Sequence, residues 1–484
     1  MMRQSILTAA LGVLLILTGC SMAPRYVRPA MPVTDSWPAD ILPRGELTPV
    51  AARSAASLGW KQFFADPHLR QVILLALMHN RDLRVTALNI TKMRGAYQIQ
   101  RSEQLPGVGI SGTYEDTGTF TSLSRDGLDS NTHNAQLAVG ISSFELDFFG
   151  RIQSLKDEAL ENYLSTEQAW RSARLSLIAE VAAAYLTLTA DRERLAISQE
   201  TLSSQSASYA IIRRKFEAGV ASELDVRQAQ TSVEQARVNI ALYTGYVAQD
   251  RNYLSLLAGT RVEQSMLPAG RLADLPAWPE VPVGLPSQVL LLRPDVLAAE
   301  HDLKAANADI GAARANFFPR ISLTAGLGTA SREMDDLFSH GTGIWAFAPQ
   351  VTLPLFTGGG NLAILRVSEA NKNIMVAKYE KAIQSAFREV SDGLALRTTL
   401  NEQLHAQEAL TQAASEAYRL SSARYAQGIE SYLNVLDSQR AMYNAQLALV
   451  GVRESREKNI ITLYKALGGG VNDDGNTLAP LPAE

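Results

Sequence analysis

The chain has 484 residues, of which 45 are basic and 49 acidic, giving a formal net charge of −4. The basic residues are dispersed, and this argues against a nucleic-acid-binding surface, which needs a clustered basic face. Because Cys20 is the only cysteine, no internal disulfide can form, and stability must come from packing and assembly.

The N-terminal segment has the pattern of an export signal. Arg3 is followed by an apolar run from Ile6 to Leu17 and by small residues before Cys20. The run is too short to span a bilayer. The four residues that end at Cys20, LTGC, resemble a bacterial lipoprotein box, which implies that a signal peptide, 1–19, is removed and that Cys20 carries a lipid. Ser21 resembles the signal for sorting to the outer membrane. An ordinary signal peptide next to an incidental cysteine is the alternative.

Two halves of the sequence repeat each other at a constant offset of 209 residues. The stretch 213–220 returns as 422–429, and Val226 corresponds to Val435. A repeated unit that cannot bury its apolar face alone needs its copy beside it. The two halves are therefore predicted to share one architecture.

The repeat and two proline-rich stretches predict the organisation of the chain. Residues 20–57 contain six prolines, among which helices do not persist, and they are predicted to form a tether behind the lipid. Residues 261–286 contain five prolines and are predicted to link a first structural repeat, 58–260, to a second, 287–470. A C-terminal tail, 471–484, follows.

The helical segments of the first repeat are a helix-like stretch from Pro67 to Gln104 and two long helices, 152–217 and 222–258. In the first long helix an apolar residue recurs every seven positions: Val181, Leu188, Leu195, Leu202, Tyr209 and Phe216. A sustained seven-residue apolar period predicts a coiled-coil seam. Gly219 predicts the reversal of an antiparallel helical hairpin, and Gly428 is its counterpart in the second repeat.

Short segments in both repeats alternate between apolar residues and small or polar ones. They are 108–114, 136–141, 321–328 and 345–355. Period-two alternation predicts strands with one apolar face, which in an exported lipoprotein favours a transmembrane barrel lined by water. The polar stretches Glu115–Thr132 and Ser331–Thr342 are predicted to be its external loops. A soluble β-sandwich is the alternative.

Four strands cannot close a sheet, and a membrane does not tolerate unpaired strand edges. The chain is therefore predicted to oligomerise, and three copies would supply twelve strands around a water-filled lumen. The predicted fold class is an α+β membrane protein, a trimeric 12-stranded β-barrel that continues into a long α-helical coiled-coil tunnel. A plain helical rod would explain the heptads but not the alternating segments.

Several motifs carry a family resemblance. They include LGW at 58–60, FADP at 64–67, ELDFFGR at 145–151, LRPD at 292–295, LPLF at 353–356 and LYKALGGG at 463–470. Together they resemble the TolC-type outer-membrane efflux channels, in particular the lipoprotein branch that serves resistance-nodulation-division multidrug pumps. This resemblance implies a homotrimer in the outer membrane of a Gram-negative bacterium, a passive exit duct for small molecules. The implied partners are a periplasmic adaptor and an inner-membrane pump.

The resemblance also implies a closed periplasmic mouth at the hairpin tips. Asp225 occupies the position of a family aspartate that holds the inner helices, and Tyr425 that of its tyrosine partner. Glu430 stands where some members carry an arginine, so their salt bridge is unavailable here. Asn434 and Asp437 stand where the family often has two acidic rings, and three Asp437 side chains would favour cations. A solvated helix face is the alternative for each.

No catalytic or cofactor site emerges from the sequence. The six histidines are scattered, with none at the i, i+4 spacing of a helical metal site. We expect no enzyme activity, no metal and no cofactor beyond the lipid on Cys20. A type I protein secretion duct and a periplasmic adaptor lipoprotein are the alternatives, although an adaptor would have one helical hairpin inserted between β-domains.

Overall fold

The computed structural model describes residues 21–37, 58–119, 130–268, 270–279 and 287–469. The predicted signal peptide, Cys20 and the C-terminal tail lie outside the described residues. The chain divides into two compact units. The first unit contains Asn89–Glu167 and Ala298–Tyr379, and the second contains Gln168–Leu297 and the chain from Glu380 onward. Four helices, α5, α6, α8 and α9, contribute residues to both units.

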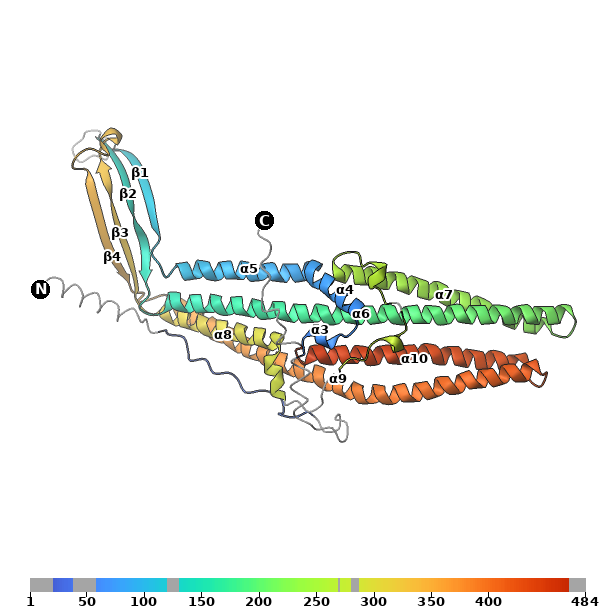
Figure 1. Cartoon of the computed structure of the whole chain (residues 1–484). Helices are drawn as coiled ribbons and strands as arrows, with labels where there is room; N and C mark the ends of the chain where they lie inside the picture. The colour runs from blue at the N-terminus through green and yellow to red at the C-terminus, as the bar shows by residue number, and fades with distance from the viewer. Residues whose placement is uncertain (1–20, 38–57, 120–129, 269, 280–286, 470–484) are drawn as a thin grey trace. The chain divides into compact units, whose positions relative to one another are not determined.

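The first unit contains one four-stranded antiparallel sheet (Figure 1). Its strands are β1 (Val108–Thr119), β2 (Ser130–Leu146), β3 (Arg320–Ser331) and β4 (Gly343–Thr352), and they pair in the order β1-β2-β3-β4. Each of the two predicted repeats therefore contains one pair of neighbouring strands. β1 and β4 are the two edges, and each has one side that none of the described strands covers.

The two faces of the sheet differ in chemistry, as the alternation predicts. One row across all four strands is apolar: Ile110, Val139, Leu327 and Trp345. These four side chains are exposed, Trp345 at 76%. The next row lies on the opposite face and consists of Gly109, Gly140, Gly326 and Ala346. A Cβ on Gly140 would lie 2.3 Å from the Ala325 carbonyl oxygen, so the strands approach closely there.

The stretch that was predicted as the first external loop is partly strand. The stretch Glu115–Thr132 was expected to be loop, but β1 runs on to Thr119 and β2 begins at Ser130, with Glu115 paired to Asn134. Polar residues on both faces hide strand periodicity, although the backbone ladder continues through them. Ser331–Thr342 fits its prediction, because β3 ends at Ser331 and β4 begins at Gly343, with a 3₁₀ turn, η5 (Met334–Asp336), between them.

The predicted helical stretch from Pro67 to Gln104 is two helices, α4 (Pro67–His79) and α5 (Arg81–Ser102). They follow a short helix, α3 (Trp60–Phe63). Asn80 lies between α4 and α5 and separates the two helices. Its side-chain oxygen accepts a hydrogen bond from the Leu83 backbone at 2.8 Å, and its amide donates to the Leu257 carbonyl at 2.9 Å. A side chain that satisfies the first turn of a helix in this way starts a new helix.

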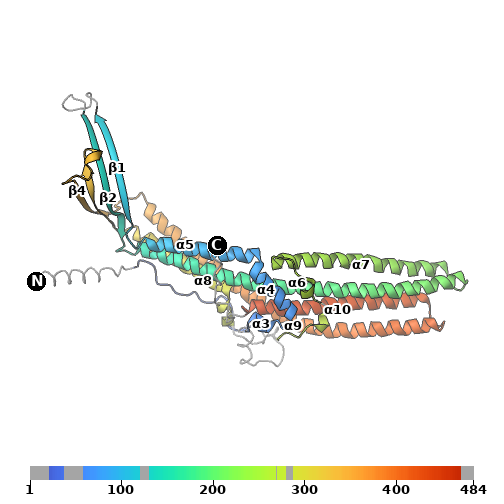
Figure 2. The same ribbon diagram turned by 45° about the horizontal axis from the view of Figure 1, so that its top comes forward.

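Two long helical hairpins extend through the second unit, with their turns at the same end (Figure 2). They are α6 (Arg151–Glu217) with α7 (Glu223–Ala258), and α9 (Gly360–Ala426) with α10 (Tyr432–Ala466). The turns contain Gly219 and Gly428, whose φ angles of 77° and 74° require a residue without a Cβ. Both α6 and α9 have 67 residues.

The remaining helices are α8 (Pro294–Ala315) and three short 3₁₀ segments, η2 (Gln264–Met266), η3 (Leu272–Asp274) and η4 (Ser287–Leu292). Among the described helices, α6 alone is long and apolar enough to cross a membrane, and 61% of that apolar window is buried inside the protein. Val181 and Leu188, which begin its heptad series, are completely buried. The apolar stretch of α6 is therefore a packing surface.

Candidate functional site

The hairpin tips pack against one another through a small hydrophobic cluster in the second unit. Its buried members are Ile212, Ala229, Tyr432, Val435 and Leu436, and the partly buried Tyr209, Val226, Tyr418 and Tyr425 pack around them. All four long helices contribute. Tyr209 of the predicted seam and residues of the other three long helices therefore join the two hairpins next to their turns.

Asp225 lies in the first turn of α7 and forms a capping box with Ser222. The Ser222 backbone donates to the Asp225 carboxylate at 3.0 Å, and the Asp225 backbone donates to the Ser222 hydroxyl at 3.1 Å. The carboxylate is near Tyr432, whose pKa is raised to about 12 by burial and by the neighbouring Tyr425, Tyr418 and Asp225. In this chain Asp225 holds the start of its own helix.

Tyr425 contacts Lys215 on the facing hairpin. The Lys215 ammonium lies 4.3 Å from the centre of the Tyr425 ring and donates to its hydroxyl at 3.3 Å. A cation over an aromatic face is attracted by the ring quadrupole. Among the described residues no hydrogen bond joins Tyr425 to Asp225, the partner that the resemblance implies. Sequence reasoning missed Lys215, because the contact spans 210 positions and no local pattern signals it.

Glu430 forms an ion pair across the second turn. Arg424 Nε lies 3.2 Å from its carboxylate, and the Asn434 amide donates to it at 3.0 Å. Glu430 thus fixes the path of the chain between α9 and α10. Arg424 was not singled out in the sequence, although its spacing of six from Glu430 across Gly428 brings the two together.

Asn434 and Asp437 are exposed on α10. They follow the spacing of one helix face, whereas Val435 and Leu436 lie in the hydrophobic cluster and Glu430 lies in the turn before α10. Asn434 and Asp437 therefore form a polar face at the start of α10, and Glu430 is joined to it through its hydrogen bond with Asn434. Their role in a gate stays a prediction.

A second polar cluster links α6, α7 and α10. Arg194 on α6 pairs with Asp191 at 2.6 Å and with Glu454 on α10 at 2.9 Å, and Lys458 also pairs with Glu454 at 2.6 Å. Asp191 and Glu454 are buried. Asp250 on α7 faces this group, and burial raises its pKa to about 6, helped by the charge of Asp191. No sequence motif marked these residues.

Comparison with known proteins identifies the family. Residues 72–260 and 285–469 match the family described as outer membrane efflux protein. The chain belongs to the outer membrane efflux protein family. It is an outer-membrane efflux channel protein. Each of the two matched stretches contains one strand pair and one long hairpin.

Relatives of this outer membrane efflux protein match along almost their whole length. The probable efflux pump outer membrane protein TtgC of Pseudomonas putida is 48% identical over 469 residues, which are 97% of this chain and 96% of the relative. A membrane protein crystal structure from Pseudomonas aeruginosa is 41% identical, with a TM-score of 0.87, over 93% of this chain and 98% of that one.

A further solved structure is the open state of the MtrE outer membrane channel from Neisseria gonorrhoeae. It is 36% identical and has a TM-score of 0.84, over 93% of this chain and 99% of that one.

Within the described part of this efflux protein, no group of three or more His, Cys, Asp or Glu residues is placed to hold a metal ion.

Proposed function

We propose that three copies of this chain form a 12-stranded barrel in the outer membrane and a helical tunnel in the periplasm. This assembly is the passive exit duct of a tripartite efflux pump. The observation that carries the proposal is the sheet itself, which has an exposed apolar face and two uncovered edges. An open edge in lipid leaves backbone groups without hydrogen-bond partners, each at a cost of several kcal/mol.

The names of the relatives support small molecules as the cargo. Two of them, 48% identical, are named an antibiotic efflux pump protein and a toluene efflux pump protein, both of Pseudomonas putida. Small molecules are therefore the proposed cargo, delivered by an inner-membrane resistance-nodulation-division pump through a periplasmic adaptor. The proposal includes the lipid on Cys20, the gate at the hairpin tips, and the two structural repeats 58–260 and 287–470 joined by the linker 261–286.

Crosslinking of the sheet edges tests the assembly. A variant with Thr113→Cys on β1 and Ala348→Cys on β4 has one thiol on each edge strand. In a closed trimer each β1 lies beside the β4 of a neighbour, so a short bismaleimide should give a covalent trimer on a denaturing gel. The bismaleimide spacer can span a small offset between the two edge strands.

The control pair is Gln136→Cys with Ala330→Cys, which are direct partners within one chain. It should give only internally crosslinked monomer. The parent chain, treated with the same bismaleimide, shows whether Cys20 reacts. Edge variants that stay monomeric in purified outer membranes would overturn the trimeric barrel. In a planar bilayer the crosslinked trimer should conduct ions, and a non-conducting trimer would contradict the duct.

A further inference from the structure

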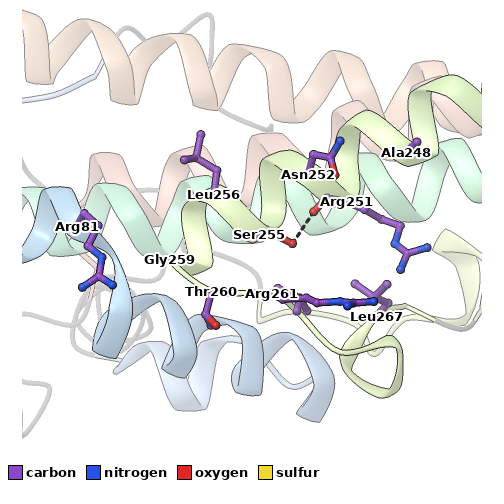
Figure 3. A pocket seen from close by; sticks show the side chains of 11 residues that line it. Arg81, Ala248, Arg251, Asn252, Ser255, Leu256, Gly259, Thr260, Arg261 and Leu267 are labelled. Carbon is purple, nitrogen blue, oxygen red and sulfur yellow. Dashed lines mark hydrogen bonds between the residues drawn. The ribbon is translucent and has the colours of Figure 1, made fainter.

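A pocket of about 700 Å³ opens where α7 ends and α5 begins (Figure 3). Eleven residues line it, and all belong to the second unit. Three are arginines, Arg81, Arg251 and Arg261, and none is an aspartate or glutamate. Figure 3 shows the Arg251 and Arg261 side chains extending toward the same side, next to Leu267. The pocket wall therefore carries three positive charges and no negative one.

These arginines have no partners among the residues that the structure describes. None of the three guanidinium groups forms an ion pair or hydrogen bond with a residue that the structure describes, and all three residues are exposed. Two less exposed arginines of the same unit behave differently, because the partly buried Arg194 and the buried Arg293 each pair with two carboxylates. The guanidinium groups of the pocket are thus available to an outside ligand.

A fourth arginine adds to the positive potential. Arg192 on α6 donates a hydrogen bond to the Pro268 carbonyl, next to Leu267 of the pocket wall. Its pKa is lowered by burial and, in addition, by the charge of Arg251. Positive charges that are held close together favour the binding of an anion between or beside them.

The pocket is built on a fixed backbone. Gly259 ends α7 with a φ of 69°, and a Cβ there would lie 2.2 Å from the His79 carbonyl oxygen. Asn80 ties the end of α7 to the start of α5 through its bond to Leu257. Arg81 follows Asn80 directly, and Arg261 follows Gly259 by two residues. A fixed backbone lowers the entropy cost of binding.

The rest of the lining combines apolar residues with three neutral polar ones, Asn252, Ser255 and Thr260. Val262 and Leu267 are buried in the wall, and Leu256 is 71% exposed beside it. A volume of this order is typical of small-molecule sites, which combine an apolar lining with a few polar groups. A ligand that fits carries a negative group on an apolar body.

We propose that this pocket binds a small organic anion with a carboxylate or sulfonate group on an apolar or aromatic body. Arg251 and Arg261 would hold the anionic group through paired N–H donors, a geometry that guanidinium groups offer to planar anions. Leu256, Val262 and Leu267 would cover the apolar part. The site is separate from the hairpin tips and does not depend on the proposed duct.

Equilibrium dialysis on the full-length protein in non-ionic detergent tests the site, with naphthoate as the probe. Naphthoate should bind saturably and at least ten times more tightly than naphthamide, its neutral analogue, and binding should weaken as salt is added. Because the assembled protein is used, a neighbouring copy that covers the pocket would abolish binding and overturn the proposal. Equal binding of the acid and the amide would overturn it as well.

Arg251→Gln and Arg261→Gln should each weaken naphthoate binding at least tenfold. Arg237→Gln is the matched control, because it removes one charge from an exposed arginine elsewhere on α7 that pairs with Glu234. This control should bind like the parent. All three residues are exposed, so the variants should keep the melting temperature of the parent, which circular dichroism can verify. If the pocket variants and the control bind equally, the site is wrong.

Discussion

At the scale of single residues, the hairpin tips are held by contacts other than the expected pair. Lys215 is the charged residue that α6 presents to Tyr425, while Asp225 is used by its own helix as a cap. Glu430 is neutralised by Arg424 within the same hairpin. Among the predicted gate residues, this leaves Asn434 and Asp437 as the exposed polar side chains of α10.

Lys215→Met should loosen the contact between the hairpins. The change keeps a long side chain but removes the ammonium group that lies over Tyr425 and donates to its hydroxyl. Such a cation–π contact is worth roughly 0.5–2 kcal/mol, so we expect the closed channel to open more often and the mean conductance in planar bilayers to rise. Tyr425→Phe keeps the ring and should have a smaller effect. Equal conductance of Lys215→Met and parent would exclude this role.

Asp437→Ala should reduce the preference of the channel for cations. In the proposed trimer three exposed Asp437 carboxylates converge, and a ring of carboxylates favours cations. Reversal potentials in a salt gradient measure the change. Asp392→Ala is a suitable control, since this exposed aspartate of α9 pairs with Arg388. A reversal potential that does not move in Asp437→Ala would place the residue outside the conduction path.

The sequence predicted which residues lie near the tips but not how they pair. Gly219, Gly428 and the heptad positions are local signals: both glycines lie in the turns and Tyr209 packs in the cluster, whereas Phe216, the last heptad position, is 43% exposed. Pairing such as that of Lys215 with Tyr425 depends on the rotation of one helix against another. Periodicity does not fix that rotation to within a side chain, so the Lys215 contact could not be foreseen.

At the scale of elements, the long helices were predictable and the strand ends were not. A seven-residue apolar period from Val181 to Phe216 leaves little freedom in the second half of α6. By contrast, β1 and β2 extend beyond their apolar part, where Glu115 pairs with Asn134 and Asp116 with His133. Strand residues with polar neighbours on both faces have no period-two signal, and backbone pairing alone keeps them extended.

The cluster that joins α6, α7 and α10 should make stability depend on pH. Burial, together with the charges of Asp191 and Glu454, raises the pKa of Asp250 from 3.8 to about 6, against the lowering effect of Lys458. Asp191 in turn pairs with Arg194, and Tyr243 is near both of them. The folded state therefore holds this proton more tightly than the unfolded state. The resulting stabilisation is complete below pH 3.8 and is lost as the pH rises through about 6.

Asp250→Asn should remove that dependence. Between pH 7.5 and 5 we expect the parent to gain about 1 kcal/mol of stability from this group, after allowance for solvent screening, and Asp250→Asn to lack that gain. Thermal melts at both pH values measure the difference. Asp392→Asn, an exposed aspartate elsewhere in the unit, should melt like the parent. A parallel response of parent and Asp250→Asn would show that Asp250 does not titrate in this range.

At the scale of the whole molecule, the described strands of one chain form an open sheet whose two edges are unpaired. The apolar row from Ile110 to Trp345 is exposed, and the glycine-rich row lies on the opposite face. The family match covers most of the chain. These features agree with a sheet that faces lipid on one side and a lumen on the other. Alternation in the sequence was sufficient to predict this division, because it depends only on the two-residue period of a strand.

Neighbouring substitutions on β4 should separate the two faces. Phe347 is 63% exposed on the face of Trp345, two positions away, whereas Ala348 lies on the opposite face. Arginine on a lipid-facing barrel position costs about 2–4 kcal/mol near the midplane, so Phe347→Arg should lower the amount of protein in the outer membrane. Ala348→Arg should insert normally and shift conductance toward anions. Membrane fractionation and bilayer recordings measure both, and equal insertion of the two variants would contradict the assignment of the faces.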